Sequence, residues 1–253
     1  MQRLVLPPHA PGMRIGLFGG TFDPPHAAHL AACLLAMKRL RLDRVWWLVT
    51  PGNPLKDTGG LAAIEHRIAA VRALARHPRI VISGFEAQRR LRYSFDTIVY
   101  LRTRCAGVRF VWIMGADNLR GFHRWRRWQD IARLIPLAVV DRLGPSLYAS
   151  AGVAGCALAR WRIPEGDAPS LPGRKPPCWV YLHGLKSALS STELRAARQS
   201  QQRRQSRRNE RTGKTAESAK AGTSSAAKPG KRRGTRTGKT HRRKRNRRAT
   251  QKG

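Results

Sequence analysis

The sequence is poor in acidic residues and has no long apolar run. Only 14 of its 253 residues are Asp or Glu, against 50 Lys and Arg, so the formal net charge is +36. No apolar stretch approaches the roughly 20 residues of a membrane-spanning helix. The first twelve residues hold only three consecutive apolar residues, too few for a secretory signal. We therefore expect a soluble, cytoplasmic protein.

Clusters typical of disulfide frameworks, metal cages and common phosphate loops are also missing. The four cysteines, Cys33, Cys105, Cys156 and Cys178, are scattered and form no C-x-x-C pair, which indicates reduced thiols. No group of carboxylates is spaced to hold a metal ion unaided. The Gly-rich segment near the N-terminus is neither a Walker A loop nor a G-x-G-x-x-G fingerprint.

Half of the net charge lies near the C-terminus. Residues 199–253 contain 20 Lys and Arg and 2 acidic residues, and no Leu, Ile, Val, Met, Phe, Trp or Tyr follows Leu194. Such a segment cannot bury enough apolar surface to offset the entropy lost on ordering. We therefore predict three parts: an N-terminal extension at 1–12, a folded domain at 13–198 and a disordered Lys/Arg-rich tail at 199–253.

The tail is a polycation without aromatic side chains for base stacking. Its composition predicts a salt-sensitive, sequence-independent attraction to RNA, DNA or other polyanions. A solubilising extension and a localisation signal are the alternative interpretations.

Apolar runs and helical patterns alternate along residues 13–198. Nearly continuous apolar runs predict buried strands at 14–18, 44–50, 79–83, 108–114, 137–141 and 179–183. Helical patterns lie between them, at 25–40, 61–76, 94–105, 119–134 and 146–160. This alternation predicts an α/β fold with a Rossmann-like, doubly wound parallel sheet of five to six strands. In such a sheet, ligands bind at the carboxyl ends of the strands.

The most informative segment is GLFGGTFDPPHAAHL, residues 16–30. An apolar run ends in two glycines, which allow the backbone to approach a ligand closely. Pro25 suits the first turn of a following helix, where its missing N–H costs nothing. Amide groups at a helix start attract phosphate, and His26 and His29 fall on one helix face beside them. The segment predicts a polyphosphate-binding site.

A strand followed by GGTFDPP and H-A-A-H resembles the H-x-G-H signature of the nucleotidyltransferase superfamily. The longer string GGTFDPPH is similar to the bacterial nicotinate-nucleotide adenylyltransferases. One position departs from the signature, because Ala28 replaces its glycine and adds a methyl group beside the nucleotide. The resemblance implies that His26 and His29 are catalytic, donating hydrogen bonds to the phosphates. It also implies an ATP and phosphate site made by Gly19, Gly20, Thr21 and Phe22.

Four further segments extend the resemblance over nearly all of residues 13–198. PGNPLKD is similar to a proline-rich loop of the family and places Lys56 near the phosphates. SSTELR resembles the family's S-S-T-x-x-R, in which Arg195 would bind phosphate, so the resemblance implies that Lys56 and Arg195 are catalytic together with the histidines. Ser191 and Thr192, near the start of a last helix that we expect to begin at Ser190, would contact the nucleotide. In isolation, Lys56 would be interpreted as a solvated loop residue.

The other two segments concern the second substrate. RYSFDTI resembles S/R-Y-T-x-D-T, where backbone amides at Tyr93 and Ser94 would hold the nicotinate carboxylate; Ser94 replaces a threonine. GADNLRGFHRWRRWQDI resembles G-A-D-N-x-x-x-F-x-x-W-x-x-W. This match implies that Trp125 stacks on the pyridine ring and that Asp117 and Asn118 bind the same nucleotide. A helical tryptophan on its own would indicate packing.

The resemblance implies a reaction in NAD biosynthesis. A phosphate oxygen of nicotinate mononucleotide attacks the α-phosphorus of ATP, giving deamido-NAD and pyrophosphate, and Mg²⁺ accompanies ATP. One alternative is another transferase of the superfamily, such as a phosphopantetheine adenylyltransferase. A second is a nucleic-acid-binding protein that works through its basic tail.

Overall fold

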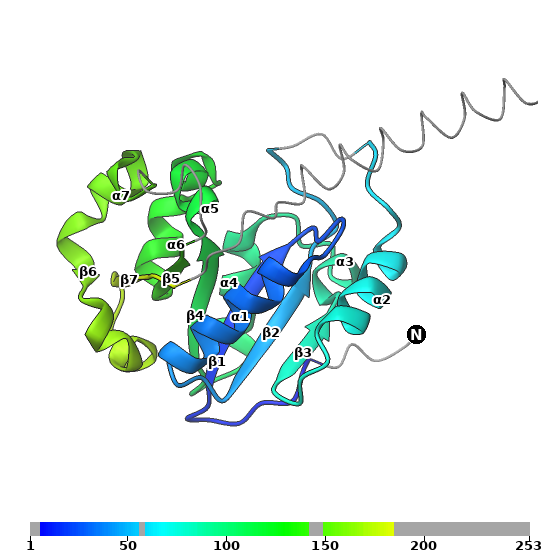
Figure 1. Ribbon diagram of the computed structural model, residues 1–253, viewed down its shortest axis with the longest axis horizontal. Helices are drawn as coiled ribbons and strands as arrows, with labels where there is room; N and C mark the ends of the chain where they lie inside the picture. The colour runs from blue at the N-terminus through cyan, green and yellow to red at the C-terminus, as the bar shows by residue number, and fades with distance from the viewer. Residues whose placement is uncertain (1–5, 56–58, 142–148, 185–253) are drawn as a thin grey trace, which may run out of the picture. The chain divides into compact units, whose positions relative to one another are not determined.

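The computed structural model describes residues 6–55, 59–141 and 149–184, and within them the apolar runs form seven strands (Figure 1). The strands are β1 (Arg14–Gly20), β2 (Arg44–Val49), β3 (Ile80–Ser83), β4 (Arg109–Gly115), β5 (Leu137–Val140), β6 (Arg162–Ile163) and β7 (Trp179–Leu182). The α-helices are α1 (Ala27–Arg39), α2 (Ile64–Leu74), α3 (Phe85–Gln88), α4 (Ser94–Arg104), α5 (Ala116–Gly121), α6 (Trp128–Leu134) and α7 (Val153–Ala157). The 3₁₀ helices include η1 (Phe122–Arg124), η3 (Ala159–Trp161) and η4 (Glu165–Gly173).

All seven strands form one parallel sheet in the order β3-β2-β1-β4-β5-β7-β6. The chain proceeds outward from β1 to β3 on one side and then returns to β4 on the other side of β1. The order therefore reverses between β1 and β4. In doubly wound sheets a crevice opens at this point, beyond the carboxyl ends of the strands.

Both faces of the sheet are covered, which explains why the strand sequences are apolar without alternation. Along β2, Val45, Trp47 and Val49 belong to one core, and Trp46 and Leu48 belong to the other. Figure 1 shows α1 and α2 on one face of the sheet and α4 behind it. The predicted fold class is confirmed.

The prediction of five to six strands is wrong by one. The additional strand, β6, has only two residues and pairs with β7 at the edge of the sheet. Two residues carry no readable periodicity, so only the pairing with β7 identifies them as a strand.

Two helix predictions also need correction. Helix α1 begins at Ala27, after Pro25, because His26 is extended (φ −146°, ψ 167°) and its N–H bonds to the ring of His29. The predicted helix over 119–134 is interrupted between η1 and α6. There Trp125 is extended and Arg127 is left-handed, with φ at 56°.

The predicted domain limits at residues 13 and 198 remain predictions, and the tail at 199–253 lies outside the described residues. Among the residues that are described, no helix is both long and apolar enough to cross a membrane.

Gly16, in β1, provides a test of the packing in the core on one face of the sheet. A Cβ atom there would lie 2.5 Å from Cδ1 of Ile113 and 2.7 Å from Cδ1 of Leu42, both in the core. We expect Gly16→Ala to lower the free energy of unfolding by about 1–3 kcal/mol, because overpacked cores must shift. Denaturant unfolding measures this loss. Gly60→Ala is the control, since its Cβ would meet no atom within 4 Å; equal stability of the two variants would contradict the expectation.

Candidate active site

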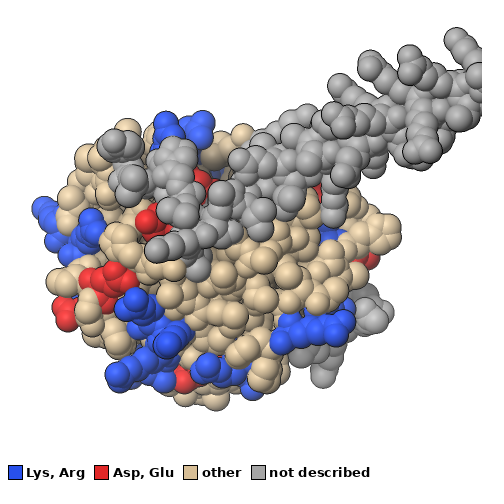
Figure 2. All heavy atoms as spheres, viewed as in Figure 1, with Lys and Arg blue, Asp and Glu red and all other residues tan. Residues whose placement is uncertain are grey.

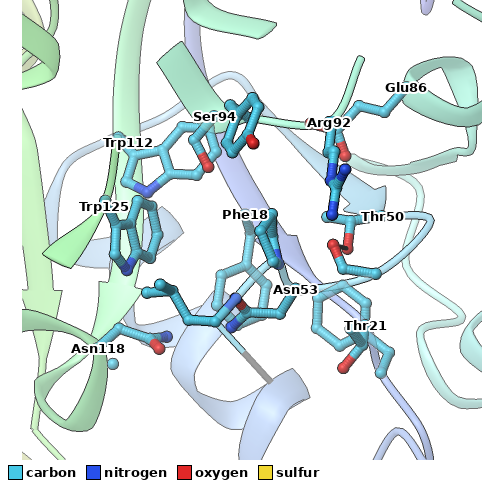
Figure 3. A pocket seen from close by; sticks show the side chains of 18 of the residues that line it. Phe18, Thr21, Thr50, Asn53, Glu86, Arg92, Ser94, Trp112, Asn118 and Trp125 are labelled. Atoms are coloured by element: carbon cyan, nitrogen blue, oxygen red, sulfur yellow. Dashed lines mark hydrogen bonds between the residues drawn. The ribbon is translucent and has the colours of Figure 1, made fainter. Parts of the chain in front are cut away.

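A cavity of about 510 Å³ lies at the carboxyl ends of β1 and β4, where the strand order reverses (Figure 3). Its wall combines the end of β1, one side of α1, the loop after β2, the segment that leads into α4, and the residues that follow β4. Segments far apart in the sequence therefore meet around one hollow. Its size suits a small-molecule ligand.

The Gly19-Gly20 pair at the end of β1 is closely covered by aromatic rings. A Cβ on Gly19 would lie 3.2 Å from the ring of Trp112, and one on Gly20 would lie 3.0 Å from the ring of Phe22. Phe22 itself is left-handed, with φ at 48°. Because both positions lack a Cβ atom, the rings of Trp112 and Phe22 can pack directly against the backbone of Gly19 and Gly20 in the cavity wall.

The two histidines at the start of α1 differ in their exposure to the cavity. Their rings are stacked, with centroids 3.7 Å apart. The backbone N–H of His26 donates to Nδ1 of His29 at 3.3 Å, so the neutral His29 ring carries its proton on Nε2. His29 lines the cavity, whereas His26 is only 6% exposed and is not part of the wall. His29 is therefore the histidine that is placed to donate to a ligand.

Trp125 stands at the opposite side of the cavity from Thr21 in Figure 3. Its ring is nearly perpendicular to that of Trp112, at 6.2 Å and 89°, and it also contacts Phe122. These contacts hold the indole in one orientation. Trp128 contacts Phe122 from a different position and is not part of the cavity wall.

The cavity brings together most of the site residues expected from the sequence. Those in its wall are Gly19, Gly20, Thr21, Phe22, His29, Tyr93, Ser94, Asp117, Asn118 and Trp125. Of the described site residues, His26 alone is outside the wall. Lys56, Ser191, Thr192 and Arg195 lie outside the described residues. The chemical roles of all these residues remain predictions.

Several residues of the wall were given no role by the sequence analysis. Three are arginines, Arg92, Arg124 and Arg126, and two more are Glu86 and Trp112. In a chain with 50 Lys and Arg, a single arginine is a weak signal. The only available hint was position, because Arg92 precedes Tyr93 and Arg124 and Arg126 flank Trp125.

Glu86, in α3, is a buried carboxyl group at the cavity. The hydroxyl of Thr97 donates to its Oε1 at 2.6 Å, and its Oε2 has no hydrogen-bond partner among the described residues. Burial raises the pKa of Glu86 to about 7, because the charged form loses its hydration. A substantial share of this group is therefore neutral near physiological pH.

Arg67, in α2, connects the loops on one side of the cavity. Its side chain is buried and donates to the carbonyl groups of Thr21 (2.7 Å), Thr50 (2.8 Å), Pro51 (3.2 Å) and Ala62 (2.9 Å). These acceptors belong to the loop after β1, the loop after β2 and the segment that leads into α2. Burial lowers the pKa of Arg67, yet a guanidinium remains charged.

Comparison with known proteins connects this site to one family. The model of the family described as cytidylyltransferase-like matches residues 17–197. A protein of Bradyrhizobium sp. (strain BTAi1), named a probable nicotinate-nucleotide adenylyltransferase, is 61% identical over 183 residues, which cover 72% of this chain and 95% of that protein. A protein of the same name from Methylorubrum extorquens is 57% identical over 72% of this chain and 99% of its own.

A solved structure shares the fold. The Plasmodium falciparum nicotinic acid mononucleotide adenylyltransferase complexed with NaAD superimposes with a TM-score of 0.53. The match covers 73% of this chain and 83% of that chain at 16% sequence identity. At this identity the likeness supports the architecture of the sheet and its helices.

Arg67 generates a prediction about stability. We expect Arg67→Ala to lower the free energy of unfolding by about 2–4 kcal/mol, because buried carbonyl groups lose a charged donor. Thermal or denaturant unfolding measures the change. Arg72→Ala, at an exposed position of the same helix, is the control and should be nearly neutral. Equal effects of the two substitutions would show that the hydrogen bonds of Arg67 contribute little.

The raised pKa of Glu86 generates a prediction about pH. The folded protein binds this proton more tightly than the unfolded chain, so the carboxyl lowers stability as the pH rises from about 4.5 to about 7. Glu86→Gln removes the titration. The difference in unfolding free energy, variant minus wild type, should therefore grow over this range and then level off, by up to about 3 kcal/mol. Urea unfolding at several pH values measures it, and parallel curves would contradict the assignment.

Proposed function

Because this chain belongs to the cytidylyltransferase-like family, and within it to the nicotinate-nucleotide adenylyltransferases, we propose that it transfers the adenylyl group of ATP to nicotinate mononucleotide. The products are deamido-NAD and pyrophosphate, and the reaction is a step of NAD biosynthesis. The main support is the 61% sequence identity to the Bradyrhizobium protein over 95% of its length. The cavity supports it, because one hollow joins the GGTFDPP loop and His29 to Trp125.

The reaction needs positioned substrates and stabilised charge more than covalent chemistry. A phosphate oxygen of nicotinate mononucleotide attacks the α-phosphorus of ATP, and pyrophosphate leaves on the opposite side. Holding the two nucleotides in line supplies much of the rate enhancement. Hydrogen-bond donors aimed at the phosphate oxygens stabilise the charge that develops in the transition state.

His29 is the donor that we assign to the transferring phosphates. Its Nδ1 accepts from the backbone of His26, which places the ring proton on Nε2. His26 is buried and stacked on His29, so we assign it a positioning role behind the catalytic ring. Lys56 and Arg195 would add positive charge around the triphosphate, and Ser191 and Thr192 would contact it. These four assignments rest on the sequence motifs alone.

Nicotinate mononucleotide would occupy the side of the cavity with Trp125. An indole face offers stacking to the pyridine ring, and Tyr93 and Ser94 stand where α4 begins. Asp117 and Asn118, in the first turn of α5, would accept and donate hydrogen bonds to the same nucleotide.

Mg²⁺ would enter with ATP. Within the described part of the chain, no three His, Cys, Asp or Glu side chains lie together as a metal site. We assign the ligation of Mg²⁺ to the phosphate oxygens of ATP, as is common for this ion.

We further propose that the protein works in the cytoplasm and that residues 199–253 attract polyanions such as RNA or DNA. Reduced thiols support the first point, because all four cysteines are free. Cys33, Cys105 and Cys178 are buried, and Cys156 is exposed. The composition of the tail supports the second.

The direct test is an assay of the full chain with ATP and nicotinate mononucleotide. Pyrophosphate release and formation of deamido-NAD should follow addition of the protein. Phosphopantetheine serves as the alternative acceptor. Turnover of phosphopantetheine without turnover of nicotinate mononucleotide would overturn the proposed substrate.

Trp125 generates a prediction about substrate binding. Base–aromatic stacking contributes about 1–3 kcal/mol, so Trp125→Ala should raise the KM for nicotinate mononucleotide about ten- to a hundredfold. The KM for ATP should change little, and Trp125→Phe should retain part of the binding. Steady-state kinetics with each substrate varied measures both constants. Equal increases for ATP and nicotinate mononucleotide would show that Trp125 acts through packing instead.

A further inference from the structure

The loops after β1 and β2 form one side of the cavity wall. Thr21 belongs to the first loop and Thr50 to the second, and Figure 3 shows both on the side opposite Trp125. The ladder between β1 and β2 ends at Gly20 and Val49. One further backbone bond follows, from the N–H of Thr50 to the carbonyl of Gly20 at 2.9 Å. Beyond this point, the spacing of the two loops depends on other groups.

Arg67 bridges the two loops from behind the wall. Its Nη1 donates both to the carbonyl of Thr21 at 2.7 Å and to that of Thr50 at 2.8 Å, so a single nitrogen joins them. Its Nη2 donates to Pro51 and its Nε to Ala62. The side chain is buried and is not part of the cavity wall. Arg67 is therefore placed to hold the loops, and not to touch a ligand.

Asp23 adds a second connection to the same network. Its carboxylate accepts from the backbone N–H of Ala62 at 3.2 Å, while the carbonyl of Ala62 accepts from Arg67. The loop after β1 is thus held at Thr21 and at Asp23. Among the side-chain hydrogen bonds of the described residues, those of Arg67 alone reach the loops after both strands.

We propose that Arg67 is a positioning residue of the adenylyl transfer, because it fixes the loop after β1 relative to the loop after β2. This inference rests on the proposed function. The first loop carries Thr21 and Phe22, which are assigned to ATP, and the second leads toward Lys56. A rigid guanidinium fork suits this task, since it stays charged when buried and its donors point in fixed directions. Transfer in line requires aligned groups, and a displacement of about 1 Å can slow a reaction about a hundredfold.

Arg67→Lys in the full-length protein tests the proposal. Lysine keeps the charge but has its three donors on one nitrogen, so it cannot reproduce a fork that spans three segments. We expect kcat per folded molecule to fall about ten- to a hundredfold. The KM values for ATP and nicotinate mononucleotide should change less, because each loop keeps its own contacts with its ligand. Arg67→Gln, a neutral donor, is the second variant and should act in the same direction.

Steady-state kinetics gives the constants, and circular dichroism at the assay temperature gives the folded fraction. Val71→Ala is the matched control, because Val71 lies one turn further along α2, is fully buried in the core and is not part of the cavity wall. It lowers stability through packing alone, so its kcat per folded molecule should equal that of the wild type. Arg79→Lys should also leave kcat unchanged, since Arg79 donates to one carbonyl, that of Leu42, away from the wall.

Wild-type kcat per folded molecule in Arg67→Lys and Arg67→Gln would overturn the proposal and leave Arg67 a role in stability alone. Failure of both variants to fold would overturn it for the same reason. An increase confined to the KM of one substrate would also overturn it, because Arg67 would then serve a single loop. Wild-type protein that does not convert nicotinate mononucleotide would refute the proposed function itself, whereas normal wild-type turnover with unchanged kcat in the variants would refute the positioning role alone.

Discussion

The buried guanidinium of Arg67 holds together the loops on which the cavity depends. The hydrogen bonds between parallel strands stop where the strands end. The loops after β1 and β2 therefore need other contacts to hold them together. Arg67 provides them by donating to carbonyl groups in both loops and in the segment that leads into α2. Desolvating a cation costs several kcal/mol, and four carbonyl dipoles offset that cost. One charged side chain outside the cavity wall thus helps to shape the wall.

The charges around the cavity suit anionic substrates. Arginines outnumber acidic groups in its wall, and burial keeps Glu86 partly neutral near pH 7. Figure 2 shows Lys and Arg in several groups near the rim of the visible face, with fewer acidic side chains. Positively charged surroundings attract phosphate groups at long range.

Much of the architecture could be predicted because burial on both faces leaves a strong pattern. Strand β2 supplies Trp46 to one core and Trp47 to the other, so its sequence is apolar throughout. The two-residue β6 could not be found this way, because its identity depends on pairing with β7. The interruption at Trp125 escaped prediction for a related reason: the left-handed Arg127 stabilises it through contacts with Phe95 and Asp130.

The amino-acid sequence by itself determined the fold class, the family and the motifs that meet at the strand ends, because these follow from local patterns of apolar residues and from short strings of characteristic residues. Only the tertiary structure decided which members of each motif reach the cavity. His26 and His29 look equivalent in H-A-A-H, yet His29 lines the cavity and accepts a hydrogen bond from the His26 backbone, whereas the His26 side chain is buried outside the wall. Arg126 and Arg127 are likewise adjacent residues with the same side chain. Their environments differ because Asp130 lies within reach of one, and the ring of Tyr93 lies beneath the other.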